Sequence, residues 1–365
     1  MRSVESAEIE KIGRRIGDAA LDPGLWPAIM EEICHAAGAT GSALLQADVR
    51  TPDIPRTASV DELFSAYFHD QWHTRDIRVR GAALLARGEP VITDQDVVTP
   101  EEMNREAFYN ECLYANGFKW FAGVGFLAGS ALWALSIQRT AQQGPFEEED
   151  KQLLALLSPK LGEAATLSTA VGRTVVSGVT NALDLVRQPA LILDRNGFVL
   201  DANALAEKAF GEEFYVKNRR VTLRNPQARA DFERLIDQLR TTGDAELSLE
   251  PIVIRCERAP PILIRILPLP LSARGPFLGA RVLLTLTSLT PKPAPSPTVV
   301  SRLFGLTLAE AKLASIIATG VSPGAAADRL GVSRDTARNQ LKAVFAKTET
   351  HRQSELVALL SQLAG

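Results

Sequence analysis

Three cations recur at four-residue steps near the end of the chain, at Arg334, Arg338 and Lys342. Asn339 lies beside them in the sequence. On an α-helix this spacing places the three cations in one row on one face. Arginine can bond guanine edges with two hydrogen bonds, asparagine can bond adenine, and arginine or lysine can hold phosphate. The row therefore predicts a DNA-binding helix. The alternative is a merely solvated face, and the surrounding elements decide between the two.

Those elements predict a helix-turn-helix. Ser322 and Pro323 have the residue types of a helix cap and a first helical position, and Gly331 can end that helix at positive φ. Ser333 can cap the next helix, which carries the cations and is predicted to run to about Lys347. Two further helices are expected, one from a capping box in "LTLAE" and one from near residue 350. Residues 301–365 are thus predicted to form an all-α four-helix domain.

Charge supports an anionic partner for this domain. Residues 301–365 carry a net charge of +3, whereas the chain as a whole carries −3, so the remaining 300 residues carry −6. A positive segment on an acidic protein points to a polyanion.

The same segment resembles the DNA-binding domain of LuxR-family transcriptional regulators. The matching residues are Leu306-Thr307, Glu310, Gly320, Ser322, Ala327, Leu330-Gly331, Ser333, Thr336, Leu341 and Lys347. The resemblance implies that the third helix enters the major groove and that the fourth supports dimerisation. The residues expected at double-stranded DNA are Ser333, Arg334, Thr336, Arg338, Asn339 and Lys342. Ala337 departs from the valine usual in that family, and Arg338 from the lysine often found there.

A proline-rich segment precedes this domain. Residues 291–300 hold four prolines at every second position, at 291, 293, 295 and 297, which predict an extended, semi-rigid linker that joins neither a helix nor a central strand.

Residues 188–290 are predicted to form an α+β domain. "PALILDRNGFVLDANALAEKAF" indicates strand, turn, strand and helix, and two long apolar strands close the segment. We expect one sheet with helices on one face. The spacing of Asp194, Gly197, Val199, Asn203 and Ala206 resembles that of a PAS domain. PAS domains often sense small molecules and often dimerise.

Residues 1–167 are predicted to form a first α+β sensor domain, and residues 168–187 a helical connector. "GSALLQ" reads as a strand and "KWFAGVGFLAGSALWALSIQRT" as a hairpin, with helical segments on both sides. In outline this domain resembles GAF-type or autoinducer-binding-type sensors. An apolar stripe from Leu153 to Val171 fits either a partner helix in a homodimer or packing on its own domain, and Pro159 should kink the helix.

Aromatic residues concentrate in this first domain, which holds all four tryptophans. Tyr67, Trp72, Asp76 and Trp120 are the candidate contacts of a small ligand, because aromatic walls and one acid are typical of such sites. Packing in the core is the competing interpretation.

No cofactor, metal or catalytic site is expected. His69 and His73 would share a face if they lay on one helix, but four metal ligands are not evident. Residues 188–290 contain no histidine or methionine for a haem. The sequence has no nucleophile–base pair or phosphate loop, so we expect no enzymatic activity.

The chain is expected to be cytoplasmic. It has three widely spaced cysteines, no apolar run long enough to span a membrane and no apolar signal segment. The prediction is a dimeric, sequence-specific transcriptional regulator whose sensors bind a small ligand and control dimer geometry, with RNA polymerase as a possible contact. In the alternative, a protein partner acts on the sensors and no small ligand exists.

Overall fold

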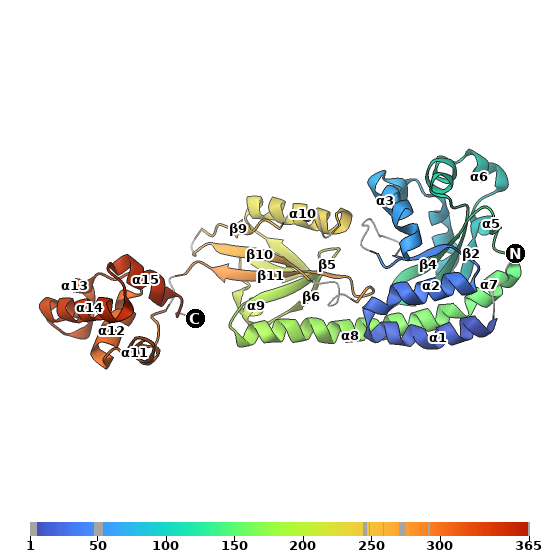
Figure 1. Cartoon of the computed structure of the whole chain (residues 1–365). Coiled ribbons are helices and arrows are strands. Elements are labelled where there is room, and N and C mark those ends of the chain that lie inside the picture. Colours follow the sequence, from blue (N-terminus) through green and yellow to red (C-terminus); the bar gives the residue numbers. More distant parts are fainter. Residues whose placement is uncertain are drawn as a thin grey trace. The chain divides into compact units, whose positions relative to one another are not determined.

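The computed structural model describes residues 6–46, 54–243, 247, 249–257, 259–269, 275–290 and 293–363 (Figure 1). The chain divides into two compact units, residues 1–257 with 262–287, and residues 258–261 with 288–365. The first unit is mixed α/β with antiparallel sheets, and the second is helical. Within these described ranges, no helix combines the length and apolar character that a membrane crossing requires.

A four-stranded antiparallel sheet lies in the amino-terminal part of the first unit. Its order is β1-β4-β3-β2, with bounds Gly41–Gln46, Ala131–Arg139, Trp120–Ala128 and Val91–Thr93. The predicted hairpin is confirmed: β3 pairs with β4 along its whole length, and Gly129 turns the chain at φ +63°. We call this sheet and the helices on it the amino-terminal subdomain.

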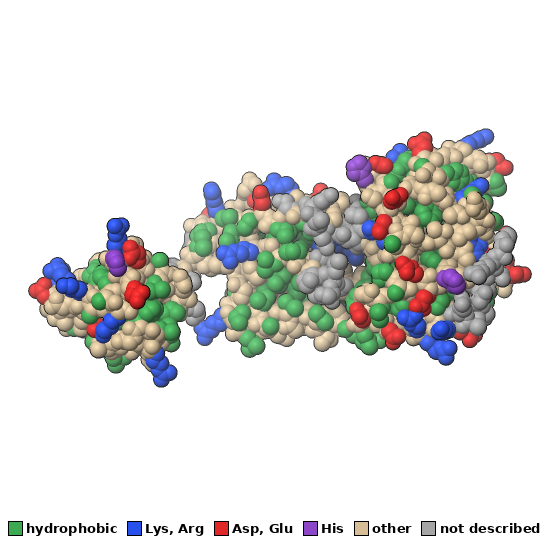
Figure 2. Space-filling model, in the orientation of Figure 1, with side chains coloured by type: hydrophobic (Ala, Val, Ile, Leu, Met, Phe, Trp, Pro, Cys, Tyr) green, Lys and Arg blue, Asp and Glu red, His purple; other side chains and the backbone are tan. Residues whose placement is uncertain are grey.

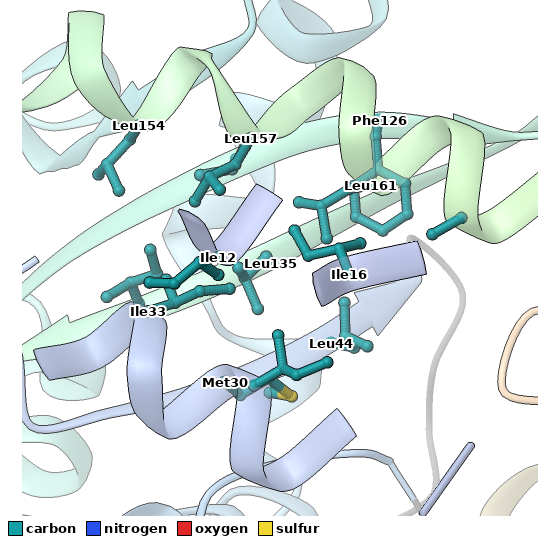
Figure 3. Packing of buried hydrophobic residues seen from close by; sticks show 14 of the residues in the cluster. Ile12, Ile16, Met30, Ile33, Leu44, Phe126, Leu135, Leu154, Leu157 and Leu161 are labelled. Carbon is teal, nitrogen blue, oxygen red and sulfur yellow. The ribbon is translucent and has the colours of Figure 1, made fainter. Parts of the chain in front are cut away.

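Helices cover both faces of this sheet (Figure 1). One layer holds α1 (Ser6–Leu21), α2 (Trp26–Ala36), α7 (Glu148–Ala155) and the first half of α8 (Leu157–Leu185). The other holds α3 (Asp61–His69), α4 (Ala82–Ala86), α5 (Asp94–Val97) and α6 (Pro100–Arg105). Figure 3 shows the core under the first layer, where residues such as Ile16, Met30, Leu135 and Leu161 interdigitate. Burial of these side chains is the main stabilisation of the subdomain.

Pro159 explains the boundary between α7 and α8. α7 ends at Ala155 and α8 begins at Leu157, so the helix breaks just before the predicted kink at Pro159. Proline has no N–H to donate to the carbonyl of Ala155, and its ring clashes with that carbonyl. Pro159 is tolerated in the first turn of α8, where N–H groups have no partner within the helix.

α8 continues without a break through residues 167 and 168, so the connector predicted at 168–187 is the second half of a helix that begins in the first subdomain. Leu157, Leu161 and Ala164 are buried in the core with α1, whereas Leu167 is 44% exposed. The apolar stripe therefore packs on its own chain at these three positions.

The middle subdomain is built on a five-stranded antiparallel sheet. Its order is β6-β5-β11-β10-β9, with bounds Val199–Ala202, Ala190–Asp194, Ala280–Ser288, Ile262–Pro268 and Ile252–Ile254. A separate hairpin joins β7 (Phe214–Lys217) to β8 (Arg220–Leu223). The predicted strands are confirmed, and helix α10 (Pro226–Thr241) follows the hairpin.

The prediction of helices on only one face of this sheet is wrong. α10 packs on the face that carries Leu191 and Leu193, and the second half of α8 packs on the face that carries Ala190 and Ile192. All four residues of this run in β5 are fully buried. An unbroken apolar run, rather than an alternating one, is typical of a strand that is covered on both faces.

The motif residues of this subdomain shape its first turn and helix. The Asp194 carboxylate accepts hydrogen bonds from the backbone N–H of Asn196 and of Phe198, both at 2.8 Å, and Gly197 has φ +76°. The Asn203 side chain caps α9 (Ala204–Ala209) and donates to the carbonyls of Thr180 and Gln188. Asn203 thereby fastens the sheet to α8.

The carboxy-terminal unit differs from its prediction at the start. Helix α11 (Pro297–Phe304) begins inside the predicted linker of residues 291–300 and precedes the four predicted helices. Pro297 occupies the first turn, where proline is pre-organised for a helix, so the proline punctuation did not exclude one. The other helices are α12 (Leu308–Ile317), α13 (Pro323–Leu330), α14 (Arg334–Thr348) and α15 (Gln353–Ser361). Residues 291 and 292 of that linker lie outside the described residues.

Candidate functional site

The cationic row lies on the outer face of α14. Arg334, Arg338 and Lys342 are all exposed, and so is Asn339. The opposite face packs inward, through the buried side chains of Ala337, Leu341, Val344 and Thr348. Lys and Arg side chains stand out from the surface of this unit in Figure 2. The structure thus presents the row to solvent, as a DNA-binding helix requires.

Local signals fix the start of α14. Gly331 ends α13 at φ +66°, and the Val332 N–H donates to the Ala327 carbonyl at 3.1 Å. Ala327 is fully buried, which lets α13 and α14 approach closely. The Ser333 hydroxyl accepts a hydrogen bond from the Thr336 N–H at 3.1 Å and pairs with the Thr336 hydroxyl at 2.8 Å. Both predicted contacts, Ser333 and Thr336, therefore also act as the helix cap.

Arg334 is the first residue of α14, where a helix disfavours positive charge because its unpaired N–H groups already make that end electropositive. An anionic ligand reverses this penalty, because those N–H groups and the cation both attract it. Asp335 partly compensates in the free protein: its carboxylate lies 3.5 Å from the Arg338 guanidinium, and both side chains are more than four-fifths exposed. Such an exposed pair is weak and exchanges readily for phosphate.

The far end of α14 is held by an ion pair. Lys347 Nζ lies 2.7 Å from the Glu310 carboxylate, which also accepts the Thr307 N–H in the predicted capping box of α12. The hydrogen bond from Lys347 lowers the pKa of Glu310. Lys347 therefore orients α14 against α12 and is not part of the exposed row.

A second candidate site is a cavity of about 160 Å³ in the amino-terminal subdomain. Two of the four predicted ligand contacts, Tyr67 and Asp76, line it. The rest of its wall comes from β1, β3, β4, α4 and their neighbours, including Leu45, His73, Arg78, Leu85, Ile92, Phe121, Leu132, Ala134 and Ser136. The wall is largely apolar, with polar groups gathered at the Tyr67–Asp76 side.

Asp76 and Arg78 form a buried ion pair at that side. Arg78 Nη2 lies 2.9 Å from Asp76 Oδ2 and Nε lies 3.0 Å from Oδ1, while the Tyr67 hydroxyl donates to Oδ2 at 3.2 Å. The guanidinium also lies over the rings of Phe108 and Phe121, at 4.5 and 4.8 Å from their centres. Burial raises the pKa of Tyr67, so its hydroxyl stays protonated. Arg78, which sequence reasoning missed, therefore fixes the Asp76 carboxylate.

The other two predicted contacts do not line the cavity. Trp72 is 6% exposed and packs in a core cluster with Phe108, with the Arg75 guanidinium 4.0 Å from its ring centre. Trp120 is half-buried between two core clusters, beneath Lys119. Trp72 therefore packs within a core cluster, and Trp120 packs against two of them.

Asp94 is a buried carboxylate that sequence reasoning did not assign to a site. It accepts a hydrogen bond from the Tyr109 hydroxyl at 2.5 Å and from the Phe121 N–H at 2.6 Å. Burial raises the pKa of Asp94 to about 6, although both hydrogen bonds oppose that shift. Because Phe121 also lines the cavity, Asp94 holds one edge of the cavity wall.

Stability should fall as pH rises through the titration of Asp94. Below about pH 4 the carboxyl is protonated in both states, but between pH 4 and 6 the unfolded chain ionises it while the folded protein resists. The free energy of unfolding should therefore fall by about 3 kcal/mol across this range. Asp94→Asn should remove this pH dependence, because asparagine does not ionise. Urea unfolding of both proteins from pH 4.5 to 7.5 measures the difference, and a difference that does not change with pH would contradict this assignment.

The two histidines considered as metal ligands do not share a helix face. α3 ends at His69, Gln71 reverses the backbone at φ +57°, and His73 lies in a separate short helix. His69 pairs with Asp70 at 2.7 Å, whereas His73 packs against Tyr67 and Phe68. Over the described ranges, no group of three or more His, Cys, Asp or Glu side chains could hold a metal ion.

The chain matches no protein-family model and no curated protein. Among solved structures it is similar to the VqsR LBD domain from Pseudomonas aeruginosa, at 16% identity and TM-score 0.37, over 44% of this chain and 96% of that one. It is also similar to the phage VqmA–DPO complex, at 16% identity and TM-score 0.21, over 52% and 89%. The E. coli DhaR(N)–DhaL complex gives 14% identity and TM-score 0.24, over 79% and 91%. At these identities and TM-scores, the similarities assign neither a family nor a function to this chain.

Proposed function

We propose that this protein is a sequence-specific, DNA-binding transcriptional regulator and not an enzyme. The observation that carries the proposal is the exposed row of Arg334, Arg338 and Lys342 on the second helix of a helix-turn-helix. The row lies on the face opposite the buried one, and its helix begins at a sharp glycine turn. This is the geometry with which such a helix enters a major groove.

The amino-terminal cavity supports a small ligand as the signal. Its volume of about 160 Å³ and its apolar wall suit a small, mostly apolar molecule with one polar end. The polar end would meet Tyr67 and His73, because Asp76 is already engaged by Arg78. Among the described residues, the buried Nδ1 atom of His73 has no hydrogen-bond partner, so it is available to a ligand.

A protein partner is the second candidate for the signal. One groove of about 990 Å³ runs between α8, the β3–β4 hairpin and the segment around Pro90, and it is lined mainly by apolar atoms. Leu127 and Leu167 on its wall are 57% and 44% exposed. Exposed apolar surface of this kind is typical of interaction sites.

In either case we propose that the protein acts as a homodimer on double-stranded DNA, in a geometry that the signal controls.

The test of DNA binding is selection from a random duplex library with the purified full-length protein. Enriched sequences with two related half-sites, and retention that falls steeply with salt, are the expected results. No enrichment and no salt-dependent retention would contradict the proposal. Organic extraction of the same protein followed by mass spectrometry tests for a small ligand, and a stoichiometric co-purifying protein would favour the second candidate.

A further inference from the structure

The turn Gly275–Gly279, which leads into β11 of the middle subdomain, carries two neighbouring apolar side chains with different partners. Leu278 is 8% exposed and packs in the core shared by β5, β11 and the second half of α8. Phe277 instead packs against the core of the amino-terminal subdomain. Adjacent residues of one short turn thus bind two different cores.

Phe277 lies among three aromatic side chains of the amino-terminal subdomain. Its ring centre is 5.5 Å from that of Trp26, 5.8 Å from Phe126 and 5.0 Å from Trp133. The three interplanar angles are 80°, 81° and 75°, which is the edge-to-face arrangement that aromatic pairs favour. Trp26, Phe126 and Trp133 are almost completely buried. The Phe277 side chain is therefore inserted into the core of the amino-terminal subdomain.

The turn itself is held by the middle subdomain. The Arg195 N–H donates to the Gly279 carbonyl at 3.1 Å, and the Arg195 guanidinium lies 3.4 Å from the Pro276 carbonyl oxygen. A Cβ added to Gly172 of α8 would lie 3.1 Å from Leu278, so the turn also fits closely on that helix. Phe277 is therefore carried on a turn that is anchored to the middle subdomain.

Strand β4 connects this insertion to the cavity. Leu132, Trp133, Ala134 and Ser136 of β4 line the cavity. Trp133 thus borders the cavity, while its side chain belongs to the core on the other face of the sheet and contacts Phe277. Side chains alternate between the two faces of a strand, so the Trp133 side chain points away from its neighbours Leu132 and Ala134. All of them share one backbone, and a displacement of β4 by an occupant of the cavity therefore also displaces Trp133.

We propose that Phe277 is an interdomain latch that couples occupancy of the cavity on one face of β4 to docking of the middle subdomain on the other. This inference rests on the proposed function of the cavity as a ligand site. An occupant that presses on Ala134 and Ser136 shifts Trp133 and weakens the hold on Phe277. By thermodynamic reciprocity, loss of the Phe277 contact changes the affinity of the cavity for its ligand.

The decisive experiment needs no identified ligand. Ala134→Leu in the full-length protein places a permanent occupant in the cavity, and hydrogen exchange followed by mass spectrometry reports on residues 275–279. We expect exchange there to become about tenfold faster, which corresponds to about 1.4 kcal/mol of lost docking. Ala107→Leu, at a half-buried alanine of the same subdomain outside the cavity, is the control and should leave these residues unchanged.

Phe277→Ala tests the reverse direction, with Phe277→Leu as the milder variant if the alanine protein does not fold. Exchange should accelerate in β4 as well as in the turn, whereas Phe198→Ala, a half-buried phenylalanine of the middle subdomain beside Arg220, should not affect β4. The unfolding free energies of Ala134→Leu and Phe277→Ala should also be non-additive in the double variant.

Unchanged exchange at 275–279 in Ala134→Leu, together with additive free energies, would overturn the latch. Failure to extract any ligand from the protein would bear only on the proposed ligand, because neither substitution depends on it.

Discussion

A variant in which Arg334, Arg338 and Lys342 are all replaced with alanine is expected to lose at least about 3 kcal/mol of binding to a selected duplex, or more than a hundredfold in Kd. An arginine that reads a guanine edge contributes about 1–3 kcal/mol, and a lysine on phosphate adds a sequence-independent share. All three side chains are exposed, so the fold should be unaffected. Removal of Arg334 from the first turn of α14 should even favour the helix slightly.

Fluorescence anisotropy at several salt concentrations measures this loss. The slope of log Kd against log salt should fall by about 2–3, because about three phosphate-neutralising cations are gone. The charge-matched control removes Arg302, Lys312 and Arg352, three exposed cations of the same unit outside α14. If the control loses as much affinity as the α14 variant, net charge and not the recognition helix drives binding.

Among the single substitutions, Asp76→Ala is expected to have the largest effect on stability, a loss of about 3–5 kcal/mol. The substitution leaves the Arg78 guanidinium without its carboxylate in a site where the side chain is only 10% exposed. The aromatic faces of Phe108 and Phe121 cannot replace two charge-assisted hydrogen bonds. Urea unfolding monitored by tryptophan fluorescence measures the effect, since the four tryptophans all lie within residues 1–167.

Asp61→Ala provides the matched control. Asp61 pairs with Arg56 at 2.5 Å in the same subdomain, but its side chain is 55% exposed, so its loss should cost about 1 kcal/mol or less. Equal losses in the two variants would show that burial of the Asp76–Arg78 pair does not determine its contribution.

The carboxy-terminal unit was the most predictable part of the chain, because its signals are local. Ser322, Ser333 and the Thr307–Glu310 box cap the helices that they were expected to cap, and Gly331 takes the expected positive φ. The prolines of residues 291–300 predict an extended segment and so hide α11, because proline also suits the first turn of a helix. α1 was not predicted, although its buried Ile9, Ile12 and Ile16 recur at helical spacing with charged residues between them, which is the pattern of an amphipathic helix.

The cavity was only half predictable, because it depends on contacts between distant segments. Tyr67 and Asp76 were identified by residue type, but the partner that fixes Asp76 is only two residues away and was overlooked. Trp72 and Trp120 were chosen on the same grounds and pack in cores. Residue type alone cannot show on which side of a sheet a side chain lies. The contact of Phe277 with Trp26 and Trp133 joins residues more than 140 positions apart, which no local pattern reveals.

The unbroken α8 has a mechanical consequence. Its 29 residues span about 43 Å. One end is buried in the core of the amino-terminal subdomain, and the other is joined to the middle sheet by the hydrogen bond from the Asn203 side chain to the Thr180 carbonyl. A rigid helix of that length converts a small rotation into a large displacement: a tilt of about 5° at the amino-terminal end of α8 moves its carboxy-terminal end by about 4 Å. Sub-ångström adjustments around a bound molecule would then arrive at the far sheet as a displacement comparable to the width of a side chain.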